Sequence, residues 1–312
     1  MNCKSICNSC WLVVGAAALL VAGPAEAITP SITSGLIAHL DGDDVTTDGS
    51  GNVTSWNDQS VSGLNDATQG TLINQPTLVS AVTPTGADVI RFDSQADSTP
   101  EYLTIGTNTT DFDASELSWF VVFRPGAGTN NRRLTSSAYS DVDPGAGTVL
   151  ESQAWGSITN ISTSTTSGGY RSLARTSTGG FNAASAGQGD PPVLNVTDFF
   201  VGSSSLDTAT DTVTAMLTLP DGTSFSSSNT NATLQLGGHL QTLIGAQTGD
   251  DLVIDTNGWS GDLAVFLVYD RLLSGSEIAT VTEELRQAYA VPEPATFGLI
   301  LLGGLAMLKR RR

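Results

Sequence analysis

The segment WSGDLAVFLVYDRLLSGSEIATVTEELRQAY, residues 259–289, combines two kinds of periodicity. Residues 263–269 form a continuous apolar run of strand length, which predicts a β-strand. Ser274 and Glu277 stand at the spacing of a capping box, and apolar residues recur at helical spacing from Ile278 to Tyr289. We therefore predict one strand followed by one short helix near the carboxyl end of the chain.

Runs of similar length recur upstream, where apolar or alternating segments are separated by Gly, Ser, Thr and Asn. Such runs bounded by turn residues are typical of strands, so the fold class is predicted to be all-β. Asp221 and Gly222, which follow Pro220, predict a tight turn between two strands. One helix after many strands favours a sandwich on whose edge or open end the helix packs. Besides 263–269, the candidate strands are 35–40, 53–56, 89–93, 102–105, 117–123, 199–204 and 212–219.

Two widely separated stretches carry a family resemblance. The first is GLIAHLD at 35–41, continuing through DGSGNVTSWND at 48–58 to NDAT at 65–68, and the second is WSGDLAVFLVYDRLLS at 259–274. Together they resemble the opening and closing strands of bacterial laminin-G-like domains of the concanavalin A type. The resemblance implies a jelly-roll sandwich of two antiparallel sheets over residues 28–290, in which the terminal strands pair.

The succession RFD at 91–93, YL at 102–103 and WFVVF at 119–123 also matches that family. Residues 126–190 match it poorly. Their Gly and Ser content predicts elongated loops specific to this protein.

Residues 291–312, VPEPATFGLILLGGLAMLKRRR, form a separate module. Its prolines prevent a helix from running into it from the preceding domain. The uncharged run at 295–308 would extend about 21 Å as a helix, which is short for a hydrocarbon core of about 30 Å. The flanking residues and the terminal cations must supply the difference by snorkelling.

This tail resembles the PEP-CTERM sorting signal of Gram-negative bacteria, and similar tails are also catalogued as an ice-binding protein C-terminal domain. The resemblance implies recognition by a membrane-embedded exosortase, removal of the tail, and export linked to extracellular polysaccharide. We expect a transient inner-membrane anchor, followed by release to the cell surface or extracellular matrix. The processing residues in the tail are Pro292, Glu293, Pro294, Lys309, Arg310, Arg311 and Arg312.

The amino-terminal residues 1–27 are typical of a secretory signal peptide. Lys4 precedes an apolar run at 11–22, and Ala25 and Ala27 form a small-x-small site for signal peptidase before Ile28. We therefore expect a hydrophobic targeting helix at each end of the chain. All the cysteines lie in this leader, so the mature chain has no thiol for disulfides, metal binding or nucleophilic catalysis.

The charge between residues 28 and 290 is strongly negative. This region holds eight arginines, no lysine and 29 acidic residues, a formal charge of −21. Such a surface repels nucleic acid and anionic membranes, and it suits solubility outside the cell or cation binding. Nucleic acid is therefore excluded as a partner.

The sequence contains none of the compact catalytic motifs expected of related enzymes. Glucanases of the concanavalin A type use a Glu-x-Asp-x-x-Glu strand, which this chain lacks, and no Gly-x-Ser-x-Gly elbow is present. His39 lies in the first apolar strand, where a packed histidine is expected. We therefore predict that the protein is not an enzyme. Two alternatives stay open: a divergent glycoside hydrolase whose carboxylates converge only in three dimensions, and a purely structural matrix protein.

Asp41, Asp43 and Asp44 are the candidate metal ligands. Carboxylates crowded on a loop that contains Gly42 are suited to Ca²⁺, because a cation would relieve their repulsion. The spacing does not fit an EF-hand, and an ordinary hydrated turn would look the same.

Glycan binding requires exposed aromatic faces beside polar groups. Trp56 and Trp119 lie in strand patterns and are expected in the core. Our interpretation is an exported, non-catalytic protein that binds glycan or matrix. The candidate ligand-binding residues are Trp155, Tyr139, Tyr170 and Trp259.

Overall fold

The computed structural model describes residues 28–94, 99–106, 110–127, 132–142, 149–160, 169–177, 181–187, 194–234, 238–247, 254 and 258–291. For residues 110, 139–142, 149–154 and 160 the description covers the backbone only. Both expected targeting helices fall outside these ranges. Within them, no helix has the length and the apolar character needed to cross a membrane.

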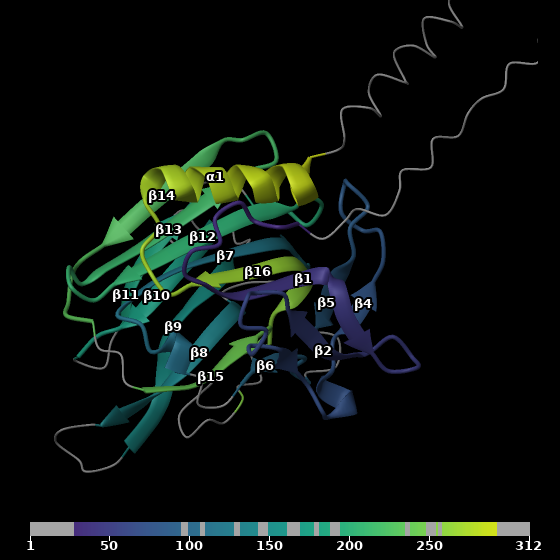
Figure 1. Cartoon of the computed structure of the whole chain (residues 1–312), viewed down its shortest axis with the longest axis horizontal. Helices are drawn as coiled ribbons and strands as arrows, with labels where there is room; N and C mark the ends of the chain where they lie inside the picture. The colour runs from purple at the N-terminus through teal and green to yellow at the C-terminus, as the bar shows by residue number, and fades with distance from the viewer. Residues whose placement is uncertain are drawn as a thin grey trace, which may run out of the picture.

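The described chain is built from strands, with one α-helix near its carboxyl end (Figure 1). The helix is α1, Gly275–Leu285, followed by a π-helical turn at Arg286–Ala290, and short 3-10 helices lie at Leu72–Asn74 and Thr110–Phe112. The strands are β1 Leu36–Thr47, β2 Val53–Asp58, β3 Ala67–Thr68, β4 Thr77–Val79, β5 Val89–Asp93, β6 Leu103–Ile105, β7 Glu116–Pro125, β8 Arg132–Val142, β9 Val149–Asn160, β10 Gly169–Arg175, β11 Phe181–Ala186, β12 Phe200–Asp207, β13 Thr212–Thr218, β14 Ser224–Asn229, β15 Gly238–Ile244 and β16 Ser260–Tyr269.

The strands form one continuous antiparallel sheet that curls over itself. Their order is β11-β10-β9-β8-β15-β6-β3-β2-β1-β16-β7-β12-β13-β14, and β5 joins β4 to β16. At the closure, β10 and β11 pack against β12, β13 and β14. There the hydroxyls of Tyr170 and Ser204 are 2.7 Å apart, and the Asn229 side chain donates to the Ala183 carbonyl. The two expected layers are thus two walls of one nearly barrel-like sheet.

The terminal strands pair as the resemblance implies. β1 lies antiparallel to β16, from Leu36 opposite Tyr269 to Asp41 opposite Val265. The predicted hairpin at Asp221–Gly222 is also confirmed, since it joins β13 to β14, and Gly222 has a φ of 89°. A left-handed conformation of this kind explains why glycine stands at that position.

Two apolar clusters cover the two faces of the central strands, which explains why β7 and β16 read as continuous apolar runs. On β7, Trp119, Val121 and Phe123 point into the interior of the sandwich, whereas Phe120 and Val122 lie under α1. Side chains alternate between the two faces of a strand, so both sets are buried when a helix covers the outer face.

The expectation of elongated loops between residues 126 and 190 is wrong for most of that region, because it contains β8, β9, β10 and β11. These strands place hydroxyl-bearing side chains in the interior, where they bond to one another. The hydroxyls of Thr135 and Ser157 are 2.7 Å apart, and those of Ser137 and Thr242 are 2.6 Å apart. A sequence rich in serine and threonine suggests loops, but here these residues lie in strands with their side chains buried.

Helix α1 begins with the predicted capping box. The Ser274 hydroxyl accepts from the Glu277 amide at 3.3 Å, and the Glu277 carboxylate accepts from the Ser274 amide at 2.8 Å. Arg271 adds an ion pair of 2.7 Å to the same carboxylate. These contacts fix the start of the helix shortly after β16.

The capping box predicts a measurable dependence of stability on pH. The ion pair with Arg271 lowers the pKa of Glu277 from 4.5 to about 2. Because the folded-state pKa is depressed, this stabilisation is complete above about pH 4.5 and is lost as the pH falls towards 2. We expect the unfolding midpoint of the wild type to fall across this window more steeply than that of Glu277→Gln. Parallel curves from thermal melts at stepped pH would contradict this.

Candidate functional site

Three of the four aromatic candidates are core residues, so the expectation that they present exposed faces to a ligand is wrong. Trp155, Tyr170 and Trp259 are each 0% exposed. Trp155 lies 4.7 Å from Trp119, ring centre to ring centre, and the indole N–H of Trp259 donates to the Thr159 hydroxyl at 2.9 Å. Trp155 projects from the interior face of β9. The serines and glycines beside it in the sequence resemble a loop composition, so the sequence does not indicate a buried strand position.

Tyr139, the fourth candidate, lies in β8, and its side chain is outside the described part of the structure. As expected, Trp56 and Trp119 are also fully buried. The aromatic residues that the sequence offers for ligand binding therefore mostly build the interior of the sandwich.

Residues 41–44 lie in β1, so the expectation that they form a loop is wrong. Their carboxylates bond to separate protein partners. Asp41 is 0% exposed and accepts from the Tyr289 hydroxyl and from the amides of Ile28 and Asp43, the two amides each at 3.1 Å. Burial raises its pKa. Asp43 accepts from the Asp88 amide at 3.0 Å, and Asp44 from the Asn57 side chain at 2.8 Å.

Among the described residues, no three His, Cys, Asp or Glu side chains gather as they would around a metal ion. Calcium binding by Asp41, Asp43 and Asp44 therefore stays a prediction, and a chelator tests it directly.

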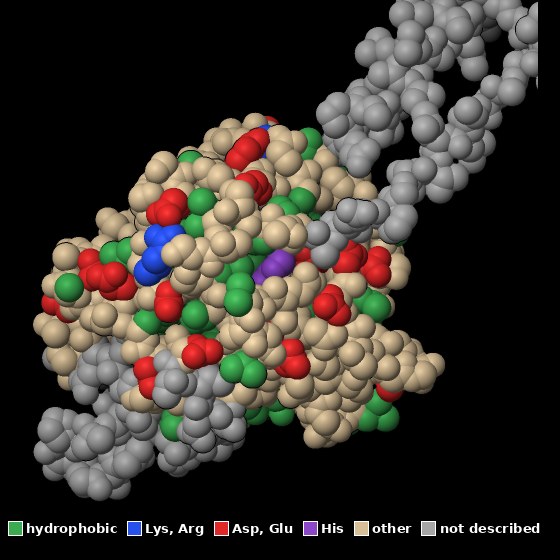
Figure 2. All heavy atoms as spheres, in the orientation of Figure 1, with side chains coloured by type: hydrophobic (Ala, Val, Ile, Leu, Met, Phe, Trp, Pro, Cys, Tyr) green, Lys and Arg blue, Asp and Glu red, His purple; other side chains and the backbone are tan. Residues whose placement is uncertain are grey.

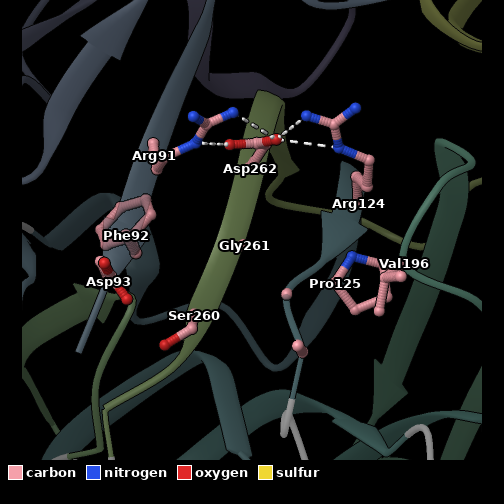
Figure 3. A pocket seen from close by; sticks show the side chains of 11 residues that line it. Arg91, Phe92, Asp93, Arg124, Pro125, Val196, Ser260, Gly261 and Asp262 are labelled. Carbon is pink, nitrogen blue, oxygen red and sulfur yellow. Dashed lines mark hydrogen bonds and ion pairs between the residues drawn. The ribbon is translucent and has the colours of Figure 1, made fainter. Parts of the chain in front are cut away.

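A pocket of about 490 Å³ opens where β5, β16 and β7 run side by side (Figure 3). The register places Asp262 directly opposite Arg91 on one neighbouring strand and opposite Arg124 on the other. Three charged residues from distant parts of the sequence therefore project from one face of the sheet. Pro125, Val196 and Ser260 also line the pocket.

Asp262 holds both arginines of the pocket. The Arg91 guanidinium is bidentate, with Nε 2.7 Å from Oδ1 and Nη2 3.2 Å from Oδ2, and Arg124 donates to Oδ2 from Nε at 2.9 Å and also from Nη2. The Asp262 side chain is only 4% exposed, whereas those of Arg91 and Arg124 are 43% and 23% exposed. The buried carboxylate therefore orients two partly exposed guanidinium groups.

The pocket has two cations around one buried acid in a domain that is otherwise strongly acidic. On the face seen in Figure 2, acidic side chains are spread over the surface and basic ones are sparse. Hydrogen bonding to Asp262 raises the pKa of Arg91, and the guanidinium of Arg124 lies 4.9 Å above the ring of Phe199. By contrast, Arg271 and Arg286 pair with glutamates on or beside α1. No motif in the sequence indicates this site, since only pairing in the sheet brings residues 91, 124 and 262 together.

A second carboxylate lies on the same face. Asp93 is exposed and pairs in register with Ser260, so it is a diagonal neighbour of Asp262. Diagonal neighbours in antiparallel strands are about 7–8 Å apart. Asp93 therefore lines the pocket beside the two arginines.

Comparison with known proteins confirms the predicted tail. A family model described as the PEP-CTERM protein-sorting motif matches residues 290–312. This motif identifies an exported protein of a Gram-negative bacterium that is sorted through the membrane. No curated protein matches the chain.

Solved structures resemble the fold at low sequence identity. Trypanosoma rangeli sialidase in complex with the inhibitor DANA matches with a TM-score of 0.50 and 13% identity, over 84% of this chain and 35% of the sialidase. The enzymatically active domain of bacteriophage CBA120 tailspike protein 2 matches with a TM-score of 0.45 and 13% identity, over 82% of this chain and 34% of that one. The CBM40 domain of Ruminococcus gnavus IT-sialidase, bound to α2,3 sialyllactose, matches with a TM-score of 0.38 and 12% identity, over 54% and 83%.

The prediction that the protein is not an enzyme is contradicted by these comparisons, because the fold recurs in a sialidase. The absence of a compact sequence motif was an insufficient reason to exclude catalysis, since carboxylates can converge from separate strands. The chain spans about a third of the length of the sialidase, so the likeness shows the fold alone. The chain thus carries a PEP-CTERM sorting motif behind a curled antiparallel sheet that also occurs within a sialidase.

Proposed function

We propose that this exported protein acts on a glycan that carries carboxylate groups, and that the pocket of Arg91, Arg124 and Asp262 is its site. The observation that carries the proposal is the pair of guanidinium groups held by one buried carboxylate. The sorting motif supports a role outside the cytoplasm. The proposed fold is the jelly roll of concanavalin A-like domains, a scaffold suited to glycan recognition.

The chemistry of the arginines favours a carboxylated sugar. Each guanidinium has five N–H donors in a rigid fork that matches the geometry of a carboxylate. Asp262 uses the Nε and Nη2 edge of each fork, so the Nη1 groups keep donors for a ligand. Because Asp262 fixes the forks before binding, less conformational entropy is lost when the ligand arrives.

Hydrolysis of a glycosidic bond is the activity we propose for this site. Asp93 is exposed and can serve as the acid, while the buried Asp262 orients the two arginines that hold the sugar carboxylate. Asp93 on β5 and Asp262 on β16 project from the same face of the sheet, so the proposed acid lies beside the arginines. Replacement of Asp93 by Asn is expected to abolish release of reducing ends while binding persists.

We further propose that signal peptidase removes residues 1–27 and that an exosortase-type membrane protease processes the tail at 291–312. Before the second cut, the tail would anchor the chain transiently in the inner membrane. The final site would be the cell surface or the extracellular polysaccharide. A structural matrix protein without glycan specificity is the competing function.

The pocket predicts a specific binding result. The exported full chain, screened against matched neutral and carboxylated oligosaccharides, is expected to retain only the carboxylated ones. Arg124→Gln should weaken binding by about 10- to 100-fold, because a hydrogen bond to a charged group contributes roughly 1.5–3 kcal/mol. Arg286→Gln is the matched control, since Arg286 pairs with Glu283 outside the pocket.

Equal binding of neutral and carboxylated glycans, or unchanged binding by Arg124→Gln, would exclude the pocket as the site. No binding to any glycan would favour the structural matrix protein. A parallel series with chelator tests the calcium prediction, which requires both binding and the melting temperature to respond to it.

A further inference from the structure

Asp41 joins the two ends of the folded domain. Its carboxylate accepts from the backbone nitrogen of Ile28 at 3.1 Å and from the hydroxyl of Tyr289. Ile28 is the first residue after the predicted leader, and Tyr289 directly precedes the sorting motif at 290–312. One side chain in β1 therefore contacts the segments beside both processing junctions.

The environment of Asp41 is unfavourable for a lone negative charge. The carboxylate is fully buried, and the donors described around it, which are two amides and one phenol, are neutral. Asp43 and Asp44 stand close by and add negative potential. An uncompensated buried carboxylate destabilises a fold strongly, so a cation at this position would have a large effect.

Cleavage of the leader would create such a cation in place. We propose that hydrolysis of the Ala27–Ile28 bond converts the Ile28 amide into an α-ammonium group that forms a buried ion pair with Asp41. Water adds across the bond, so that Ala27 leaves with a new carboxylate and the Ile28 nitrogen takes up protons to become NH₃⁺. The nitrogen already lies at hydrogen-bond distance from the carboxylate, so no rearrangement of the fold is needed.

The side chain of Ile28 keeps the new terminus in place. It packs against the apolar cluster between α1 and the sheet, which also contains Tyr289 and Ala290. The ammonium group therefore cannot move into solvent without exposing apolar surface. Removal of the leader would in this way stabilise the segment that leads to the sorting motif, and the domain would be completed only after export.

The composition of the chain allows a direct test. Lys4 and Lys309 are the only lysines, so a Lys309→Arg chain, once the leader is removed, has its α-amine as its sole primary amine. This chain would be exported from a bacterial host, sequenced from its amino terminus, and treated with an amine-reactive probe in the folded and denatured states. The matched control inserts one glycine before Ile28, which restores a neutral amide at Ile28 and moves the ammonium group by about 3.6 Å.

We expect the sequence to begin at Ile28. The folded α-amine should react about tenfold more slowly than that of the glycine-inserted control, which a charge-assisted hydrogen bond suffices to explain. Both chains should react equally when denatured. The inserted glycine should also lower the melting temperature by about 5 °C in the chain that retains Asp41. In an Asp41→Asn chain the same insertion should have little effect.

Equal labelling of the two folded chains would overturn the proposal, as would a mature terminus at another residue. An equal loss of melting temperature on glycine insertion in the wild-type and Asp41→Asn backgrounds would also overturn it, because the loss would then be independent of the carboxylate. If Asp41→Asn fails to fold, the labelling comparison between the two chains that retain Asp41 still decides the question.

Discussion

Trp155→Ala is expected to destabilise the domain by about 3–5 kcal/mol, the usual cost of emptying a fully buried Trp site. Trp155 is 0% exposed and packs between Trp119 and Phe112, with ring centres 4.7 and 6.3 Å away. Its removal leaves a cavity between the two walls of the sheet that neighbouring strands cannot close without losing their register. Most of the effect should therefore be on stability, in contrast to the role in ligand binding that the sequence predicted for this residue.

Denaturant unfolding of the exported chain measures this effect. Phe181→Ala is a suitable control, because Phe181 is also an aromatic strand residue in the same wall but is 41% exposed. The control should lose far less stability than Trp155→Ala. If Trp155→Ala retained the wild-type stability and lost only glycan binding, the core position of Trp155 would be contradicted.

Asp58→Ala is expected to destabilise the domain by about 2–4 kcal/mol, because it leaves buried amides without acceptors. The Asp58 carboxylate accepts hydrogen bonds from the amides of His39, Ser60 and Asn65 and from the Ser60 hydroxyl. These bonds tie β1 to the loop after β2. Without them, the pairing of β1 with β2 and the path towards β3 both weaken.

Thermal and denaturant unfolding again provide the measurement. Asp48→Ala is the matched control, since Asp48 also accepts from nearby amides, those of Ser50 and Asn52, but lies on an exposed hairpin. Water can replace its hydrogen bonds, so the control should lose much less stability. Equal losses for the two variants would mean that burial does not determine the role of Asp58.

The structural elements that the sequence predicts correctly are those that depend on residues close together in the chain. The apolar run of β16, the capping box at Ser274 and the Asp221–Gly222 turn each depend on residues close in sequence. The periodicity of apolar residues and the presence of turn-forming residues are sufficient to predict such elements. The sorting motif at 290–312 is similarly local, because its Pro-Glu-Pro sequence, its apolar run and its terminal cations follow one another directly in the chain.

The sequence does not predict strands β8 to β11, because some of their interior-facing side chains are polar. Thr135 and Ser157 satisfy each other across β8 and β9, and Tyr170 is satisfied by Ser204 across the closure of the sheet. A hydroxyl can be buried at low cost only when its partner is present. The partner lies on another strand, so it cannot be predicted from the residues that are adjacent in the sequence.

The all-β class, the helix near the carboxyl end and the exported destination all follow from the amino-acid sequence, because each depends on short-range patterns or on a contiguous motif. The pairing of the terminal strands is implied only by the family resemblance, because the two strands lie more than 200 residues apart. The folded structure was needed to establish which aromatic residues are buried, that Arg91, Arg124 and Asp262 share one pocket, and that Asp41 contacts the segments beside both processing junctions. Strand register sets the pocket, and the packing of the terminal segments against β1 sets the contacts of Asp41. Register depends on the closure of the whole sheet, so residues more than a hundred positions apart become neighbours without any local signal.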